Sequence, residues 1–228
     1  MKLSEAVDLI DILKVAKQYT KEALIYYGSL KEYKKGEYIF LDRSKVDNVY
    51  FLVKGTVALY KLNKHGEKRV IFVYGKPAIL NEVIIQNEVS SVNCEVLEES
   101  LLLSFNREQF IELMKNDFNF TKAIMDELAL KVRRLYHQLK NTCNNTTIDK
   151  QIAAKLWKLS KDNGIKGEIG IEINFDLSIT YLAELLGSRR ETVSRAVKIL
   201  TNNKLITVKK NRFYVIDREL LLQYFKDV

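Results

Sequence analysis

Three charged side chains within six residues, Arg190, Glu191 and Arg195, have the types and spacing to read the edges of nucleic-acid bases. An arginine can donate two hydrogen bonds to guanine, and a glutamate can accept one from the amino group of cytosine. The apolar residues of the same stretch, Val193 and Leu200 among them, recur at helical spacing. The pattern therefore predicts a helix whose outer face carries these charges. The alternative is that they form ion pairs with one another along the helix surface.

The segment that must position these side chains, residues 177–206, has the signals of a helix-turn-helix. Ser178 is expected to cap a first helix, and Gly187 is expected to end it because glycine readily takes the positive φ of a tight turn. Ser188 and Glu191 have the S-x-x-E form of a capping box, which predicts that a second helix starts at once. In such a motif the N-terminal end of the second helix points into the major groove of DNA.

Positive charge is concentrated in the same part of the chain. The formal net charge is +8, and residues 188–212 contain eight Lys or Arg residues and one acidic residue. A surface that contacts phosphates needs such a concentration, whereas the net charge alone is equally typical of a lysine-rich solvated surface. Lys209, Lys210 and Arg212 fall at the turn of an expected strand pair. They are either a basic wing beside the groove or an exposed hairpin tip.

Residues for other kinds of chemistry are sparse. Cys94 and Cys143 form no C-x-x-C pair, and His65 and His137 are too far apart in the sequence for a metal cluster. We find no nucleophile–base pair and no glycine-rich phosphate loop, so the sequence predicts no catalytic residues, no metal and no enzyme. The two cysteines are either a redox pair or reduced thiols. The sequence has no recognisable signal peptide or membrane-spanning run, which favours a cytoplasmic protein without a membrane partner.

The residue pattern of the N-terminal half changes from helical to β-rich along the chain. Residues 4–27 read as a helix. Residues 33–105 read as short β-rich runs split by turn signals, the pattern of an antiparallel sandwich or barrel, with a helical turn at 81–86. Asn106 to Gln109 resemble a capping box, which is expected to open a further helix through Met114.

A long helical pattern over 118–141 separates this part from the C-terminal part. Its apolar residues are spaced nearly like a coiled-coil seam. Such a seam either packs on the chain's own barrel or pairs with a second copy, and we expect it to form a homodimer. A polar hinge is predicted at 141–147 and a half-buried strand at 169–175. The expected dimer-interface residues are Ile124, Leu128, Val132, Leu135 and Leu139.

Together these motifs resemble the CRP/FNR family, named for the cyclic-AMP receptor protein and the fumarate–nitrate regulator. The stretch GSRRETVSRAVKIL is similar to the recognition helix of that family, and KKGEYIF and VYFLVKGTVALYKLNKHGEKRVI are similar to the opening strands of its sensing barrel. The resemblance implies an α+β fold. It consists of a cupin-like β jelly-roll effector domain with an N-terminal helix at 1–115, a dimerisation helix at 116–142 and a C-terminal winged helix-turn-helix at 143–228.

The resemblance also implies a sequence-specific transcription regulator that acts as a homodimer. Glu191 and Arg195 match the family's base-reading pair, Ser194 matches a serine of the fumarate–nitrate branch, and Arg190 matches an arginine of the cyclic-AMP branch. These matches imply a palindromic site with a TGA…TCA core, with double-stranded DNA and RNA polymerase as partners. The residues expected to contact DNA are Ser178, Thr180, Ser188, Arg189, Arg190, Glu191, Thr192, Ser194, Arg195, Lys198, Lys210 and Arg212.

The sensing half departs from the cyclic-nucleotide binders of that family. Asn81-Glu82 stands where their phosphate cassette would have Gly-Glu, and Ser90-Ser91 stands where it would have Arg-Ser. A buried phosphate would then lack its counter-charge, so cyclic AMP is not expected as the effector and no cofactor is predicted. Any effector is expected near Glu82, Ser90, Ser91 and Tyr136. The alternatives are a nucleotide-binding module that acts on a protein partner and a regulator without an effector.

Overall fold

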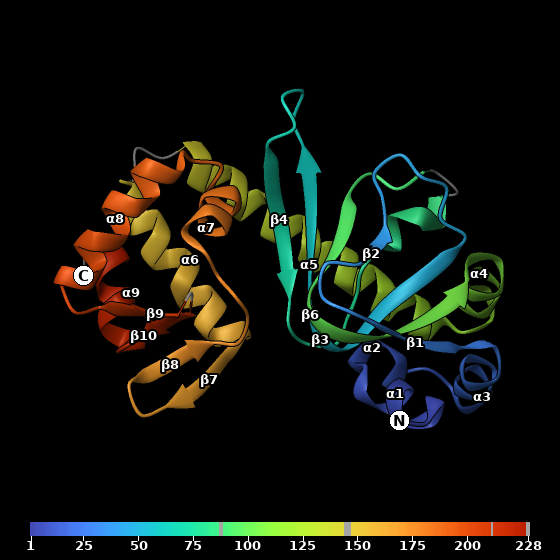
Figure 1. The fold of residues 1–228 in the computed structure, drawn as a ribbon. Helices are drawn as coiled ribbons and strands as arrows, with labels where there is room; N and C mark the ends of the chain where they lie inside the picture. The colour runs from blue at the N-terminus through green and yellow to red at the C-terminus, as the bar shows by residue number, and fades with distance from the viewer. Residues whose placement is uncertain (87–88, 144–146, 211, 227–228) are drawn as a thin grey trace. The chain divides into compact units, whose positions relative to one another are not determined.

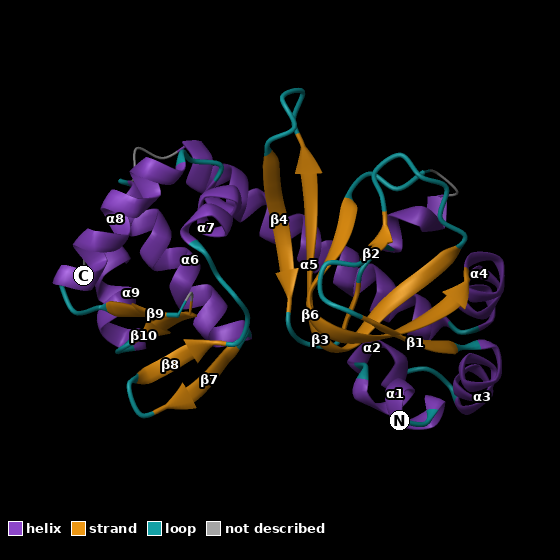
Figure 2. Cartoon of the chain, viewed as in Figure 1, coloured by secondary structure: helices purple, strands orange, loops and turns teal. Residues whose placement is uncertain are grey.

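The computed structural model describes residues 1–86, 89–143, 147–210 and 212–226. The chain divides into two compact units: Met1–Leu59 with Val73–Leu139, and Tyr60–Phe72 with Lys140–Val228 (Figure 1). Helices and strands occur in both parts of the chain, which confirms the α+β class (Figure 2).

An antiparallel sheet contains the strands of the first unit, and the end of β3 and most of β4, which fall in Tyr60–Phe72, are the parts of this sheet that belong to the second unit. Its strand order is β1–β6–β3–β4, while β2 pairs with β6 and β5 pairs with β3. The register places Ser29 opposite Ser104 in the β1–β6 pair and Phe51 opposite Ile79 in the β3–β5 pair. A short 3-10 helix, η1, spans Glu82–Gln86, where a helical turn was expected. The strands are β1 Ser29–Tyr33, β2 Tyr38–Phe40, β3 Asn48–Leu62, β4 Lys68–Tyr74, β5 Ala78–Ile79 and β6 Asn93–Asn106.

The strands β3 and β6 approach each other closely at Gly55. This residue has a φ of +96°, and a Cβ atom built there would lie 2.2 Å from Ser100 Oγ and 2.4 Å from the carbonyl oxygen of Glu99. The Thr56 amide donates to the same Ser100 Oγ at 3.1 Å. The backbone therefore requires glycine at this position for two independent reasons, its dihedral angle and the space beside it.

Three short helices stand where the sequence predicts one helix over 4–27. They are α1 Leu3–Leu9, α2 Asp11–Lys14 and α3 Gln18–Tyr27, and they gather with α4 at one end of the sheet (Figure 1). Extended backbone at Ile10 and Lys17 interrupts the helical path. The breaks let apolar side chains from all three helices, Val7, Leu13 and Leu24 among them, reach one core. Tertiary packing thus overrides the local helical pattern.

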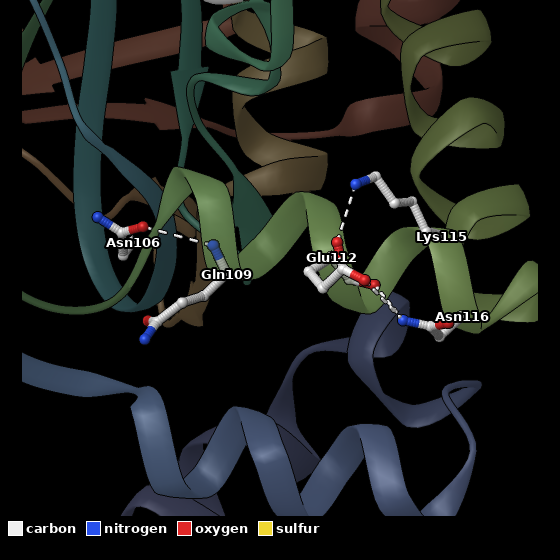
Figure 3. Close-up of polar contacts among 5 residues, drawn as sticks. All are labelled: Asn106, Gln109, Glu112, Lys115 and Asn116. Carbon is white, nitrogen blue, oxygen red and sulfur yellow. Dashed lines mark hydrogen bonds and ion pairs between the residues drawn. The ribbon is translucent and has the colours of Figure 1, made fainter.

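The helix α4, Arg107–Asn116, begins and ends on side-chain hydrogen bonds (Figure 3). Asn106 accepts from the backbone amides of Glu108 at 3.0 Å and Gln109 at 3.4 Å, which confirms the expected cap. At the other end, Asn116 Nδ2 donates to the carbonyl oxygen of Glu112 at 2.9 Å. The helix therefore runs two residues beyond the predicted end at Met114.

The long helix α5, Phe118–Cys143, carries two apolar faces rather than one continuous seam. Phe120 and Ile124 are fully buried in the core of their own unit, whereas Val132, Leu135 and Leu139 are 43%, 39% and 62% exposed. Each helical residue advances about 100°, so repeated steps of four rotate the ridge by about 40° each. The expected interface role of Ile124 is therefore wrong. Leu128 is partly buried against the core.

The second unit contains a four-stranded antiparallel sheet of order β7–β8–β10–β9. The strand expected over 169–175 is shorter, Gly170–Ile173, and pairs with a strand that the sequence did not indicate, β7 Gly164–Gly167. The predicted hinge at 141–147 begins as helix, since α5 continues to Cys143, and residues 144–146 lie outside the described residues. The remaining elements are α6 Ile148–Asp162, α7 Ile179–Leu186, α8 Arg190–Asn202, β9 Ile206–Lys209, β10 Arg212–Val215 and α9 Arg218–Lys226.

Candidate nucleic-acid interface

The helix α7 is bounded by the two residues that the sequence indicates. Ser178 Oγ accepts a hydrogen bond from the Tyr181 amide at 3.0 Å, and Gly187 takes a left-handed conformation with φ 62° and ψ 40°. The buried side chains of Leu182 and Leu185 hold α7 in place. The first helix and the turn of a helix-turn-helix are therefore present as expected.

The helix α8 starts differently from the expectation. Its N-cap residue is Arg189, which is extended and makes no side-chain capping bond, so the capping box predicted from Ser188 and Glu191 is wrong. The Ser188 amide instead donates back to Ala183 at 3.1 Å and completes the end of α7. No side-chain acceptor caps the start of α8, and uncapped amide groups at a helix N-terminus can bind a phosphate oxygen.

The two faces of α8 separate cleanly by burial. Exposed side chains occupy the outer face, and Arg195 Nε donates to the carbonyl oxygen of Glu191 at 3.4 Å. The inner face packs against α6 and α7. The exposed charges are Arg190, Glu191, Arg195 and Lys198; the buried residues are Val193, Ala196, Val197 and Leu200.

The hairpin of β9 and β10 divides its basic residues between two roles. Lys209 lies opposite Arg212 in the register, and Lys210 is exposed with a φ of 47°; Asn211 lies outside the described residues. Arg212 is half-buried and meets two carboxylates, Glu172 at 3.6 Å and Asp176 at 3.2 Å. Arg212 therefore ties β10 to Glu172 and Asp176, a role that the sequence did not indicate. Lys209 and Lys210 are the exposed cations of the hairpin.

The other residues expected to contact DNA lie around the same helix-turn-helix. Thr180 and Arg189 are exposed. The remaining four are half-buried and can present only part of their surface to a partner. They are Ser178, Ser188, Thr192 and Ser194.

Comparison with known proteins agrees with this geometry. Residues 30–117 match the model of the cyclic nucleotide-binding domain, and residues 150–224 match the Crp-like helix-turn-helix domain. The chain belongs to the CRP/FNR family. Its relatives are transcription regulators rather than enzymes, and the protein is a CRP-like transcription regulator with a helix-turn-helix DNA-binding domain.

The relatives of this CRP/FNR regulator are distant in sequence but match along most of the chain. The global nitrogen regulator of Synechococcus elongatus is 23% identical over 212 residues, which cover 86% of this chain and 89% of the relative. ArcR of Staphylococcus aureus, an HTH-type transcriptional regulator, is 24% identical over an alignment that covers 99% of this chain and 92% of ArcR. The structure of FixK2 from Bradyrhizobium japonicum superposes with a TM-score of 0.74 at 18% identity, covering 86% and 96% of the two chains.

The four residues that the sequence suggested for an effector do not share one environment in this CRP/FNR chain. Glu82 and Ser90 are buried, whereas Ser91 and Tyr136 are exposed. Ser90 Oγ donates to the carbonyl oxygen of Val92 at 2.8 Å, so its hydroxyl already serves the local turn. A single buried site lined by all four residues is therefore not formed.

The partner of Glu82 is a residue that the sequence analysis did not identify. Lys131, on α5, forms an ion pair with the Glu82 carboxylate and donates to the carbonyl oxygen of Ile79 at 2.8 Å. Burial lowers the pKa of Lys131, and the attraction of Glu82 opposes that shift. The residues next to Lys131 in the sequence give no sign of a partner 49 residues away.

The remaining chemical candidates add no second site to this CRP/FNR regulator. Cys94 is a free, buried thiol, and burial raises its pKa well above the ordinary value, so the thiolate form is suppressed. The side chain of Cys143 lies outside the described residues. Over the described ranges, no group of three or more His, Cys, Asp or Glu residues could hold a metal ion. Within those same ranges, no helix has the length and apolarity to cross a membrane.

Proposed function

We propose that the regulator binds a palindromic DNA site with a TGA…TCA core through the outer face of α8. The observation that carries this proposal is the exposure of Arg190, Glu191 and Arg195 on one side of a helix whose other side is buried. Arginine and glutamate on such a face can contact guanine and cytosine directly. Exposed Lys198, Lys209 and Lys210 supply the phosphate contacts that fix the helix in the groove.

A palindrome has two equivalent arms, so the proposal requires two copies of α8. We infer that a second copy of the chain supplies it by pairing along α5. The exposed apolar residues Val132, Leu135 and Leu139 support this, because a row of apolar side chains on one helix is best buried against a second one. The two recognition helices would then enter successive major grooves about 34–36 Å apart.

The proposed partners are double-stranded DNA in the cytoplasm and, by analogy with the family, RNA polymerase. We expect control through the N-terminal unit, with cyclic AMP not the effector. The stretch of residues 79–92 contains no Lys or Arg to neutralise a cyclic phosphate. No cofactor is proposed.

An electrophoretic shift assay tests base reading. Wild type is expected to bind the TGA…TCA palindrome more tightly than a duplex of equal length with the core scrambled. Arg195→Ala should lose about 1–3 kcal/mol of that discrimination, roughly five- to 150-fold in affinity ratio. The matched control is Lys166→Ala, which removes one exposed positive charge from β7 in the same unit.

The two classes of result are distinct. A loss of discrimination in Arg195→Ala with discrimination retained in Lys166→Ala supports the proposal. Equal wild-type affinity for the palindrome and the scrambled duplex would overturn it, because the outer face of α8 would then contribute charge but no base reading.

A further inference from the structure

The ion pair of Lys131 and Glu82 is the most deeply buried charge pair that we find among the described residues. The two side chains are only 7% and 6% exposed. Lys131 Nζ also donates to the carbonyl oxygen of Ile79 and lies 5.3 Å from the centre of the Tyr74 ring. One ammonium group thus connects α5 to η1, to β5 and to the end of β4.

Lys131 lies on the side of α5 that faces the core. Steps of four and seven residues lead from Phe120 to Ile124 and on to Lys131, so the three side chains point within about 40° of one another. Phe120 and Ile124 are fully buried in the core. Among the residues of α5 whose side chains are described, Lys131 is therefore the last buried one, and after it Val132 and Leu135 are exposed.

The buried pair is neutral by itself without a ligand. Glu82 brings one negative charge, Lys131 brings one positive charge, and residues 79–92 contain no Lys or Arg. Glu127 and Arg134 also act on this lysine, with opposite signs. An anionic small molecule placed beside this pair would add negative charge next to the buried Glu82 carboxylate, whose ion-pair partner Lys131 is already engaged. Burying such an uncompensated charge is strongly unfavourable.

We propose that Lys131 is a positioning residue whose ammonium group holds α5 on the sensing domain through Glu82, so that DNA binding needs no anionic effector. The lysine links the long helix to the segment around η1 by contacts within the chain. This inference rests on the proposed DNA-binding function and specifies its regulation.

The test compares three variants with wild type, all freed of nucleotide before use. Lys131→Met leaves the Glu82 carboxylate buried without its cation. The double variant Glu82→Gln with Lys131→Met removes both charges and so relieves that penalty. The control Lys122→Met removes a lysine from the same helix whose pair with Asp126 is exposed on the surface.

Three readouts are taken from each protein, the first of which is the thermal midpoint of unfolding. Amide hydrogen exchange of α5 is measured on the free protein, and affinity for the palindrome is measured with and without added cyclic AMP or cyclic GMP. Wild type and Lys122→Met are expected to protect residues 128–135 and to bind DNA equally well with or without nucleotide. Lys131→Met should lose this protection and at least ten-fold in affinity.

The double variant separates positioning from stability. We expect it to regain the thermal midpoint of wild type, because no unpaired charge remains buried, while its DNA affinity stays at least ten-fold weaker. The inference is overturned if the double variant recovers both the thermal midpoint and the DNA affinity of wild type. It is also overturned if Lys131→Met retains wild-type protection and affinity, or if wild type binds the palindrome only after nucleotide is added. Failure of the proposed function would look different: wild type would not discriminate the palindrome, whatever the exchange data show.

Discussion

The carboxylate of Asp117 accepts a hydrogen bond of 2.6 Å from the backbone amide of Lys17, one hundred residues earlier in the chain. Thr20 donates to the same oxygen at 2.8 Å, and the Phe120 amide donates to the other at 3.2 Å. One buried carboxylate therefore joins the start of α3 to the start of α5. This contact also explains how the backbone can leave the helical path at Lys17 without losing a hydrogen bond.

Acid should weaken this junction. Burial acts to raise the pKa of Asp117, but the hydrogen bonds from Lys17, Thr20 and Phe120 outweigh it and hold the pKa below the ordinary value. A lowered pKa contributes stability above the unfolded-state pKa, and that stability is lost as the pH falls through the folded-state pKa. Urea unfolding between pH 7 and pH 2 should therefore show a smaller acid loss for Asp117→Asn than for wild type. At pH 7 the substitution should cost about 1.5–3 kcal/mol.

The control for this measurement is Asp126→Asn, which changes an exposed carboxylate on α5. It should leave the pH profile close to that of wild type. If Asp117→Asn and wild type have parallel profiles, the carboxylate does not carry the junction.

Two glycines with similar dihedral angles should respond differently to substitution by alanine. Gly55 has φ +96° and crowded surroundings, whereas Gly36 has φ +85° and no atom within 4 Å of a built Cβ. Gly36→Ala should cost about 1–2 kcal/mol from backbone strain alone. Gly55→Ala should cost clearly more, because the β3–β6 contact must also open. Chemical denaturation of both variants measures the difference, and equal losses would mean that the space at Gly55 is not limiting.

Introducing a carboxylate into the exposed apolar row of α5 should dissociate the proposed dimer. Leu135 is 39% exposed in the single chain, so Leu135→Asp should be tolerated by the fold while placing a charge in the interface. Light scattering after gel filtration should report twice the chain mass of 26.5 kDa for wild type and the single-chain mass for the variant. Tyr26→Asp, at a residue 81% exposed on α3, is the control and should remain dimeric. A wild-type protein of single-chain mass at micromolar concentration would refute the pairing.

The contact of α6 and α9 should weaken at alkaline pH. The Tyr224 hydroxyl donates to Asp149 at 2.5 Å, and burial together with this carboxylate raises the pKa of Tyr224 to about 12. A raised pKa contributes stability below the ordinary tyrosine value, near 10, that is lost as the pH rises through the folded-state value. Tyr224→Phe should cost about 1 kcal/mol at pH 7 and flatten the decline between pH 10 and about 12. Unfolding of both proteins, monitored by circular dichroism at pH 7, at pH 10 and at about pH 12, checks this. An unchanged decline in the variant would mean that other groups cause the alkaline loss of stability.

The features that the sequence predicted correctly are those with local causes. Ser178 and Asn106 cap helices through amides two or three residues away, and Gly187 ends α7 through its own dihedral angles. Each requires only neighbouring residues, so a short window contains the whole explanation. The exposed face of α8 follows in the same way from the spacing of its apolar residues.

The features that the sequence missed depend on partners far along the chain. Lys131 meets Glu82 at a separation of 49 residues, and Arg212 meets Glu172 across the sheet. The breaks at Ile10 and Lys17 arise because the surrounding core decides the path of the N-terminal helices. The capping box at Ser188 failed for a local reason instead, because its amide donates to Ala183 at the end of α7.

The side chains of α8 that face outward and those that fasten it to the protein are two separate sets. Arg190, Glu191 and Arg195 belong to the first, and Val193, Ala196 and Leu200 belong to the second. Mutation can therefore alter the first set while the packing that orients the helix stays intact. In a lineage of such regulators, a new target sequence is accessible through a few surface changes, without passing through an unfolded or disordered ancestor.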